Sequence, residues 1–473
     1  MQVLTLKKYL FFSILFFTIV SSGQNTLTLK KGIVKDSLVI PSTGNRFSIY
    51  LPKSFDLNKK WPILLGFDTT GETGKTATLY KKVAEEHGYI VAISNFLEDQ
   101  KEGKKIKYVS DFMNHVFSLF PIQDRRVYLI GQESDARLAS LIPLIYTDEV
   151  FGVIAINDSY YYTPEIKIKK NFSYLGIISA DNYRYSSFLN NKKYLKNKAI
   201  PADVFVYQKT VADQRSKLIG KSLSTFTLQA MAKGRVPKDT LWVKGLFQKD
   251  MIQVISYIDT GLFLEAYNEI ERIRSKYGMF METTHLKEKQ KEIKKEKEYK
   301  RQKRLQTKYF KKERFLKELY AYSLDIDVKE KKFENLGWWK YQILELDSLQ
   351  QKKEKYAYNM AYRTKGYMKY LVDTYKKVIA TTNNSLEERL LLNILSTIID
   401  KKDFTSYLEV ISLSAADQDK ETVLFYLEQL LENGYSDFNT LYTIEGTLSI
   451  RMSEEYNRMI KKYLGKSKYF FSN

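Results

Sequence analysis

The segment from Val127 to Ala139 reads Val-Tyr-Leu-Ile-Gly-Gln-Glu-Ser-Asp-Ala-Arg-Leu-Ala, and it constrains the fold more than any other part of the chain. A hydrophobic run from Val127 to Ile130 ends at Gly131, and a helix-forming segment begins at Ala136. A buried strand that enters a helix through a tight turn is typical of sheets in which strands and helices alternate. The segment therefore predicts an α/β fold with this strand near its centre.

The surrounding sequence agrees, because strand and helix patterns alternate from Thr26 to about Gly234. The predicted strands are 32–40, 45–51, 61–67, 89–94, 127–130, 152–156, 175–179 and 202–207, and further predicted helices are 79–86, 106–120 and 218–232. Such alternation predicts a mainly parallel sheet that is covered by helices on both faces.

After about Asp239 strand patterns nearly disappear, and helical hairpins are predicted over 251–277 and 404–433. Hairpins repeating at roughly 34 residues are typical of tetratricopeptide-like arrays, although both pairs lack the consensus small residues. The predicted organisation is a signal peptide at 1–23, an α/β domain at 24–238, a helical hairpin at 239–285, a basic helical connector at 286–318 and a helical repeat-like domain at 319–473.

The first residues of the chain are typical of a secretory signal. Lys7 and Lys8 precede an apolar run, 9–20, which is followed by the small residues 21–23. This run is shorter than the ~20 residues that a membrane-spanning helix needs. The chain has no cysteine, which excludes disulfides and thiolate metal sites. We expect an exported protein, either periplasmic or released from the cell.

The net charge of +21 is concentrated in one segment. Between Lys287 and Glu318 there are 15 lysines and arginines and 6 acidic residues. Residues 287–315 are predicted to form one long exposed helix, with partial disorder as the alternative. An exported basic protein suits an anionic envelope polymer or lipid surface, through Lys287–Lys317, better than it suits nucleic acid. Ordinary solvation of a charged helix face is the simpler interpretation.

Six blocks follow one another in a specific order and spacing: Arg-Phe-Ser-Ile-Tyr-Leu-Pro at 46–52, Trp-Pro-Ile-Leu-Leu-Gly-Phe at 61–67, Val-Ala-Glu-Glu-His-Gly-Tyr-Ile-Val at 83–91, Arg-Val-Tyr-Leu-Ile-Gly at 126–131, Phe-Gly-Val-Ile-Ala-Ile at 151–156 and Gly-Ile-Ile-Ser-Ala-Asp at 176–181. Together they resemble secreted bacterial α/β-hydrolase-fold esterases of the polyhydroxybutyrate-depolymerase and feruloyl-esterase kind. The resemblance covers roughly 30–234, which is under half of the chain.

This resemblance implies that residues 131–135 occupy the nucleophile elbow, whose usual pattern is G-x-S-x-G. Gly131 matches the first glycine, but Glu133 stands at the nucleophile position and Asp135 replaces the second glycine. Glutamate is not a hydroxyl nucleophile, and Asp135 crowds a turn that normally takes small residues. The elbow is therefore predicted to be degenerate.

The remaining catalytic positions follow from the same resemblance. Asp181, directly after a strand, matches the triad acid. The triad histidine should lie in 208–212, which contains none, and the three histidines of the chain are His87, His115 and His285. The loop at 67–71 reads Phe-Asp-Thr-Thr-Gly where the family often has His-Gly. Nucleophile and base are therefore both missing, which removes acyl-transfer chemistry.

Three hypotheses remain open. The first is a catalytically inactive hydrolase homologue that binds a small molecule or a protein, with Glu133 paired to Arg137 one helical turn on. The second is an active esterase or peptidase-like hydrolase that uses Ser134 or an unrecognised group. Glu133 as the nucleophile is a further alternative, since the resemblance includes hydrolases of this fold that use an aspartate there for dehalogenation or epoxide opening. The third is a structural envelope scaffold in which the helical repeats carry the function. No sequence pattern indicates a cofactor or a metal site.

Overall fold

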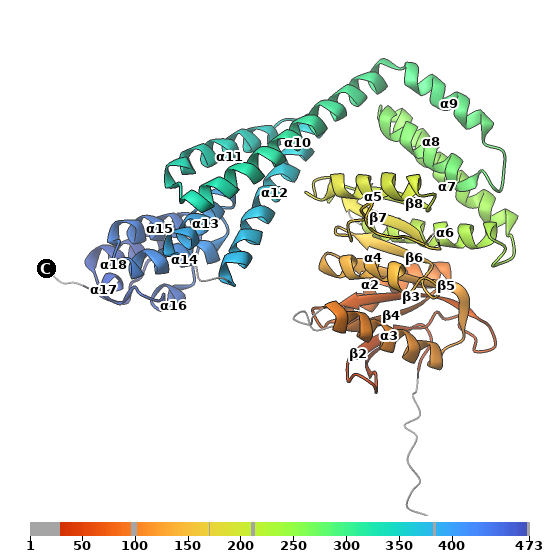
Figure 1. Ribbon diagram of the computed structural model, residues 1–473, viewed down its shortest axis with the longest axis horizontal. Coiled ribbons are helices and arrows are strands. Elements are labelled where there is room, and N and C mark those ends of the chain that lie inside the picture. The colour runs from red at the N-terminus through yellow and green to blue at the C-terminus, as the bar shows by residue number, and fades with distance from the viewer. Residues whose placement is uncertain (1–28, 96–101, 170, 210–212, 382–384, 471–473) are drawn as a thin grey trace, which may run out of the picture. The chain divides into compact units, whose positions relative to one another are not determined.

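The structure is a computed structural model that describes residues 29–470 except 96–101, 170, 210–212 and 382–384 (Figure 1). The predicted signal peptide at 1–23 lies outside the described residues. Within the described ranges, no helix combines the length and the apolar composition that a membrane crossing requires.

Eight strands form one sheet in the order β1-β2-β4-β3-β5-β6-β7-β8 (Figure 1). The strands are β1 Val34–Val39, β2 Arg46–Tyr50, β3 Trp61–Asp68, β4 Ile90–Asn95, β5 Ile122–Gln132, β6 Gly152–Ile156, β7 Ser173–Ser179 and β8 Ala202–Tyr207. Every strand that the sequence predicts is present, and helices follow the sheet to the end of the described chain. The predicted class, a mainly parallel α/β sheet domain followed by an all-α region, is confirmed.

The residues up to Gln123 contain the antiparallel edge of this sheet. β2 pairs antiparallel with both β1 and β4, whereas β3 pairs parallel with β4. Helix α2 spans Thr73–His87 and α3 spans Glu102–Leu119. The prediction for the first of these helices, 79–86, was therefore too short by six residues at its start, where the sequence is polar and small rather than periodic.

From Asp124 onward the sheet is parallel, with β5 paired to β6, β6 to β7 and β7 to β8. All residues of β6 and β7 are buried, as expected for strands that are covered on both faces. Helices α4, Ser134–Ile145, and α6, Gln214–Ala232, accompany these strands. Helix α5, Tyr185–Asn197, was not predicted, because only three of its 13 residues are buried and its apolar stripe is narrow.

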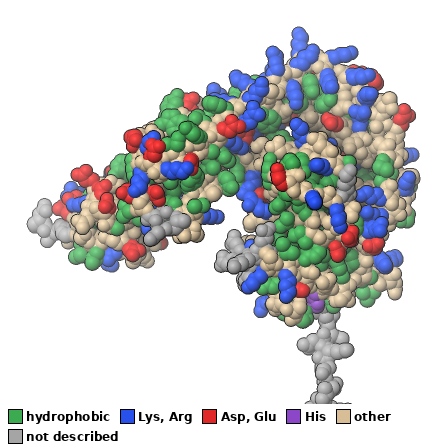
Figure 2. Space-filling model, viewed as in Figure 1, with side chains coloured by type: hydrophobic (Ala, Val, Ile, Leu, Met, Phe, Trp, Pro, Cys, Tyr) green, Lys and Arg blue, Asp and Glu red, His purple; other side chains and the backbone are tan. Residues whose placement is uncertain are grey.

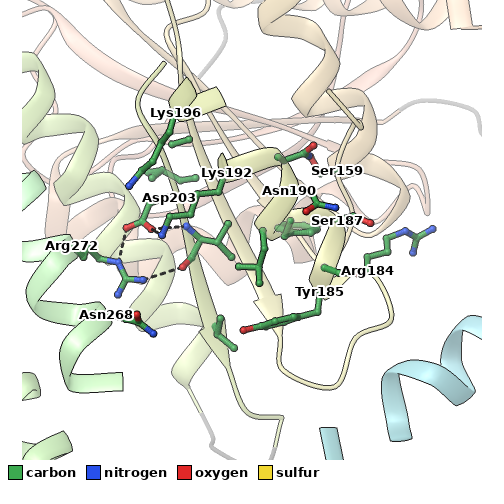
Figure 3. Close-up of a pocket in the computed structure, with 18 of the residues that line it drawn as sticks. Ser159, Arg184, Tyr185, Ser187, Asn190, Lys192, Lys196, Asp203, Asn268 and Arg272 are labelled. Carbon is green, nitrogen blue, oxygen red and sulfur yellow. Dashed lines mark hydrogen bonds and ion pairs between the residues drawn. The ribbon is translucent and has the colours of Figure 1, made fainter. Parts of the chain in front are cut away.

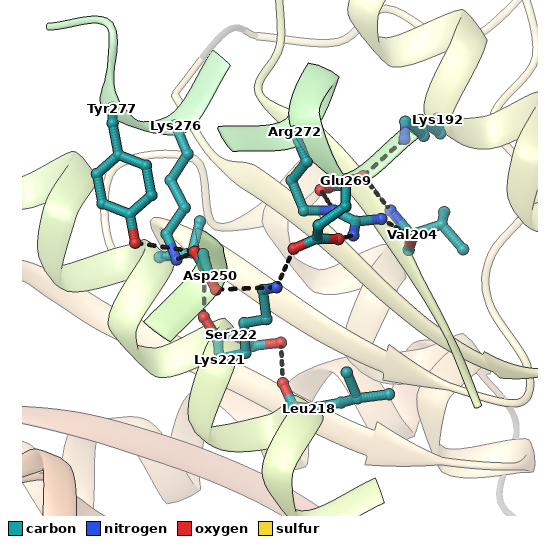
Figure 4. Close-up of polar contacts among 12 residues, drawn as sticks. Lys192, Val204, Leu218, Lys221, Ser222, Asp250, Glu269, Arg272, Lys276 and Tyr277 are labelled. Carbon is teal, nitrogen blue, oxygen red and sulfur yellow. Dashed lines mark hydrogen bonds and ion pairs between the residues drawn. The ribbon is translucent and has the colours of Figure 1, made fainter. Parts of the chain in front are cut away.

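Helices α7, Thr240–Asp259, and α8, Phe263–Tyr277, form a hairpin that polar contacts join to the sheet. The Arg272 guanidinium on α8 lies 2.5 Å from the Asp203 carboxylate on β8 and also pairs with Glu269 (Figure 4). Lys221 on α6 bridges Glu269 at 2.5 Å and Asp250 at 3.1 Å. Buried charges in proteins need such pairing, so this network fixes the hairpin against α6 and β8.

The basic connector differs from the single helix that the sequence predicts. It consists of α9, Thr284–Lys295, and α10, Lys297–Glu330, which are separated at Glu296, where ψ is 135°. An extended residue of this kind cannot continue the helical hydrogen-bonding pattern, so the helix breaks there. The alternative of disorder is also wrong for these residues, because both segments are helical.

The remaining helices build two separate hydrophobic cores. They are η1 Phe333–Asn335, α11 Leu336–Gln350, α12 Lys355–Ala380, α13 Leu386–Ile399, α14 Phe404–Ala416, α15 Lys420–Glu432, α16 Phe438–Leu441, α17 Leu448–Arg451 and α18 Glu454–Leu464. One core lies around Tyr320, Ile343 and Met360, and the other around Leu427 and Tyr456. The helical region therefore has hydrophobic cores of its own, which contain no residue of the sheet.

Candidate functional site

The turn between β5 and α4 has the backbone geometry of a nucleophile elbow. Glu133 has φ 49° and ψ −126°, a conformation that residues with side chains rarely adopt. A Cβ placed on Gly131 would lie 2.5 Å from the Asp135 carbonyl oxygen, so only glycine fits there. Glu133 thus lies at the apex of a sharp turn between β5 and α4, and Ser134 is the first residue of α4.

The Glu133 side chain is held by a residue at the end of the next strand. Asn157 Nδ2 donates a hydrogen bond to Glu133 Oε1 at 2.7 Å and another to the Tyr207 hydroxyl at 2.9 Å. The expected pair between Glu133 and Arg137 is wrong, because the Arg137 guanidinium lies 3.4 Å from the carboxylate of Asp158 instead. Asp158 is buried, so it requires a cationic partner more than the exposed Glu133 does.

Asp181, which the sequence resemblance places at the position of the triad acid, also has a partner on each oxygen. The Ser179 hydroxyl donates to Asp181 Oδ1, and Lys209 Nζ lies 3.2 Å from Asp181 Oδ2. Lys209 follows β8, in the segment where the family resemblance requires a histidine. A lysine ammonium has three donors and no acceptor, so it cannot take a proton from a nucleophile as an imidazole does.

The histidines stand on helices rather than after β8. His87 is the last residue of α2, and His285 lies in the first turn of α9. His115 on α3 packs edge-on against Phe47, with ring centroids 5.6 Å apart, and burial lowers the pKa of its imidazole. These positions suit packing and helix termini, and none of them is the position at which the triad histidine belongs.

A hollow of about 870 Å³ lies next to Asp181 and Lys209. Its other lining residues come mainly from α11 to α15 and include Tyr362, whereas Glu133 does not line it. A hydrogen bond with Tyr362, then burial and the charge of Asp181, raises the pKa of Tyr358. The acid position thus faces a concave surface that the helical region helps to form.

Helices α10 and α12 hold the loop that carries Asp181. Arg363 Nη1 donates to the Ala180 carbonyl oxygen at 2.8 Å, and its guanidinium pairs with Glu313 at 2.7 Å. Both side chains of this pair are at most 5% exposed. Lys317 Nζ donates to the Tyr183 carbonyl oxygen at 2.8 Å. The polypeptide on both sides of Asp181 is therefore bound by residues that lie more than 130 positions further along the chain.

Sequence reasoning missed three residues of this site. Asn157 and Lys209 follow strands β6 and β8, and polar residues at the carboxyl ends of parallel strands are where ligands of α/β proteins bind. That position was the signal by which both could have been found. No local signal marks Arg363, because its partners are distant in the sequence. Among the described residues, no group of three or more acidic or histidine side chains could hold a metal.

The chain matches no family model and no curated protein. Solved structures similar to it include FphF, a fluorophosphonate-binding serine hydrolase of Staphylococcus aureus, with 11% identity over 41% of this chain and 96% of that chain and a TM-score of 0.33. Another is the feruloyl esterase module from Clostridium thermocellum, with 13% identity, 37% and 81% coverage and a TM-score of 0.33. Est1E from Butyrivibrio proteoclasticus has 12% identity, 42% and 99% coverage and a TM-score of 0.33. Scores this low say nothing of activity, and the α/β-hydrolase-type fold is assigned from the sheet and the elbow.

Proposed function

We propose that this protein is an exported, catalytically degenerate α/β-hydrolase homologue that binds a ligand or a protein partner at the cell envelope. The observation that carries the proposal is that a hydrogen-bonded glutamate stands at the apex of the elbow. Its strained backbone is kept, but its apex is Glu133, whose carboxylate is hydrogen-bonded by Asn157. The acid position is likewise engaged, by Lys209.

Acyl transfer needs a nucleophile and a base that removes its proton. At this elbow the apex residue is a carboxylate, and the group beside Asp181 is a cation. Ser134 is exposed at the start of α4, one residue beyond the apex, and the alternative of an active esterase would rest on this hydroxyl. The charged groups around the site therefore favour binding over turnover.

Two features support a binding role. A strained backbone persists only where the surrounding structure imposes it, and the elbow keeps its strain without a nucleophile. The Asp181 position also opens onto a hollow of about 870 Å³, which falls within the usual size of ligand sites, roughly 300–1,000 Å³. Export is proposed from Lys7, Lys8 and the apolar run that follows.

The test is hydrolysis of short-chain aryl esters by the purified protein without residues 1–23. We expect the rate to equal that of buffer, and the Ser134→Ala variant to be indistinguishable from the unchanged protein. The Glu133→Ser variant should also stay inactive, because no base is placed to take the hydroxyl proton. Turnover that Ser134→Ala abolishes would overturn the proposal and establish the esterase alternative. Recovery from the periplasm or medium with a new N-terminus near Gln24 would test export.

A further inference from the structure

A groove of about 1710 Å³ lies beside α5, and its lining includes Arg137 and Asp158 but not Glu133. Its lining residues come mainly from α5, β8, α6, α8 and α10, and Figure 3 shows Lys192, Lys196 and Arg272 among the lining side chains. This volume exceeds the roughly 300–1,000 Å³ of pockets for small molecules. An extended ligand would fill it better than a compact one.

Basic residues dominate the lining: 11 are lysines or arginines and 5 are acidic. Three of them, Lys303, Lys311 and Arg314, belong to α10 and are called the groove cations below. Their spacing of eight and three residues places them on one side of the helix. In the part of the chain that the structure describes, none of the three forms an ion pair with a carboxylate.

Elsewhere a few cations of the connector pair with carboxylates of the same helix. Lys291 pairs with Glu288 at 2.8 Å, and Arg301 pairs with Glu298 at 2.6 Å. Figure 2 shows the Lys and Arg side chains that stand along α9 and α10. Pairs of this kind are what solvated helix faces contain, so the simple interpretation of the connector suits α9 and the start of α10. Among the described residues, the groove cations lack such pairs, as do Arg304, Lys308 and Lys312 on the same helix, and they differ from these three in lining the groove.

The part of the lining that α5 and β8 contribute is also short of negative charge. Lys192 lies 2.6 Å from Asp203, but Asp203 is shared with Arg272. Burial, followed by the charge of Lys192, lowers the pKa of Lys196, while the charges of Asp203 and Glu271 act in the opposite direction. Bound anions would reduce the electrostatic repulsion among the lysines and arginines of the lining.

The uncharged lining identifies the kind of anion. Ser187, Asn190 and Asn268 bring hydroxyl and amide groups to the groove (Figure 3), and such groups bind the hydroxyls of sugars. Four aromatic rings of the lining are stacked in pairs, Tyr183 on Tyr370 at 5.1 Å and Tyr185 on Phe310 at 5.9 Å, whereas Tyr161 is exposed. Bases of a nucleic acid need open rings on which to stack, and these two pairs offer none.

We propose that this groove binds a segment of an acidic polysaccharide, with carboxylates on the groove cations and Lys196 and hydroxyls on the amide side chains. The inference rests on the proposed binding role and adds the ligand class and the place of binding. It does not depend on the elbow, because Glu133 does not line the groove.

The test measures binding of fluorescent oligogalacturonate to the protein that begins at residue 24 and keeps all of the following residues. The first variant carries Lys303→Gln, Lys311→Gln and Arg314→Gln. The matched control carries Arg304→Gln, Lys308→Gln and Lys312→Gln, which removes the same charges from exposed residues of α10 that do not line the groove. Losing three charged contacts should weaken binding about tenfold or more in the first variant. The control should stay within about twofold.

Further arms establish the ligand chemistry. Methyl-esterified oligogalacturonate has the same sugar chain without charge and should not bind, and binding of the acid form should fade as the Debye length falls from about 10 Å at 0.1 M salt to about 3 Å at 1 M. Equal weakening by the two variants would overturn the proposal, since the charge would then act without a site. Tighter binding of a single-stranded DNA oligonucleotide that the groove variant selectively weakens would overturn the ligand class. Ester hydrolysis by the same protein would contradict the proposed loss of catalysis but would not contradict polysaccharide binding in the groove.

Discussion

Replacing Glu133 by glycine and by alanine measures the strain stored in the elbow. At φ 49° and ψ −126°, a residue with a side chain costs about 1–3 kcal/mol relative to glycine. Both replacements remove the hydrogen bond from Asn157, and Asn157 keeps its partner Tyr207 in both. The difference between the two variants therefore isolates the backbone strain.

Glycine also makes the unfolded chain more flexible, and this offsets about 0.5–1 kcal/mol of the strain energy that glycine removes from the folded state. We expect Glu133→Gly to unfold about 1 kcal/mol less readily than Glu133→Ala, or about 2–4 °C higher for a domain of this size. The assay is thermal unfolding followed by circular dichroism, with urea unfolding as a second measure.

A matched pair at Arg137, the fourth residue of α4, serves as the control, because both variants lose the same ion pair with Asp158. There glycine should be the less stable residue, by about 1 kcal/mol. The opposite signs at positions 133 and 137 are the expected result. If Glu133→Ala is as stable as Glu133→Gly, the elbow is not strained and the reasoning that places Glu133 at its apex is refuted.

Two further predictions concern the buried charges. Arg363→Met leaves the buried Glu313 paired with Lys317 alone and removes the hydrogen bond to the Ala180 carbonyl oxygen, so it should cost about 1–3 kcal/mol of unfolding free energy, as denaturant titration can show. Burial would raise the pKa of the Asp203 carboxyl, but the charges of Arg272 and Lys192 outweigh burial and hold that pKa below its ordinary value. Its stabilisation is complete above about pH 4 and is lost as the pH falls toward the lowered pKa, so stability should drop less in acid for Asp203→Asn.

The sheet and the elbow could be predicted because their signals are local. Buried strands such as β6 and β7 are continuous apolar runs, and Gly131 ends the strand that enters the elbow. Helix α5 could not be found in the same way, because Phe188, Asn191 and Leu195 alone are buried and most of its other residues are polar. The spacing of apolar residues does not reveal a helix when only one narrow stripe of that helix is buried.

The candidate site was predictable only in part. Glu133 and Asp181 follow strands whose order the sequence reveals, so their positions could be assigned. Their partners could not, because the contact of Glu133 with Asn157 and of Ala180 with Arg363 joins segments 24 and 183 residues apart. The pair expected between Glu133 and Arg137 had the right spacing, but the buried Asp158 attracts that guanidinium more strongly.

The central claim, that the elbow no longer performs acyl transfer, is tested most directly by fluorophosphonate labelling. These probes attach covalently to a serine hydroxyl that a neighbouring base activates, and intact-mass spectrometry reads the adduct. We predict that the protein without residues 1–23 gains no adduct under conditions that label an active serine hydrolase completely. A stoichiometric adduct that peptide mapping places on Ser134 would contradict the account.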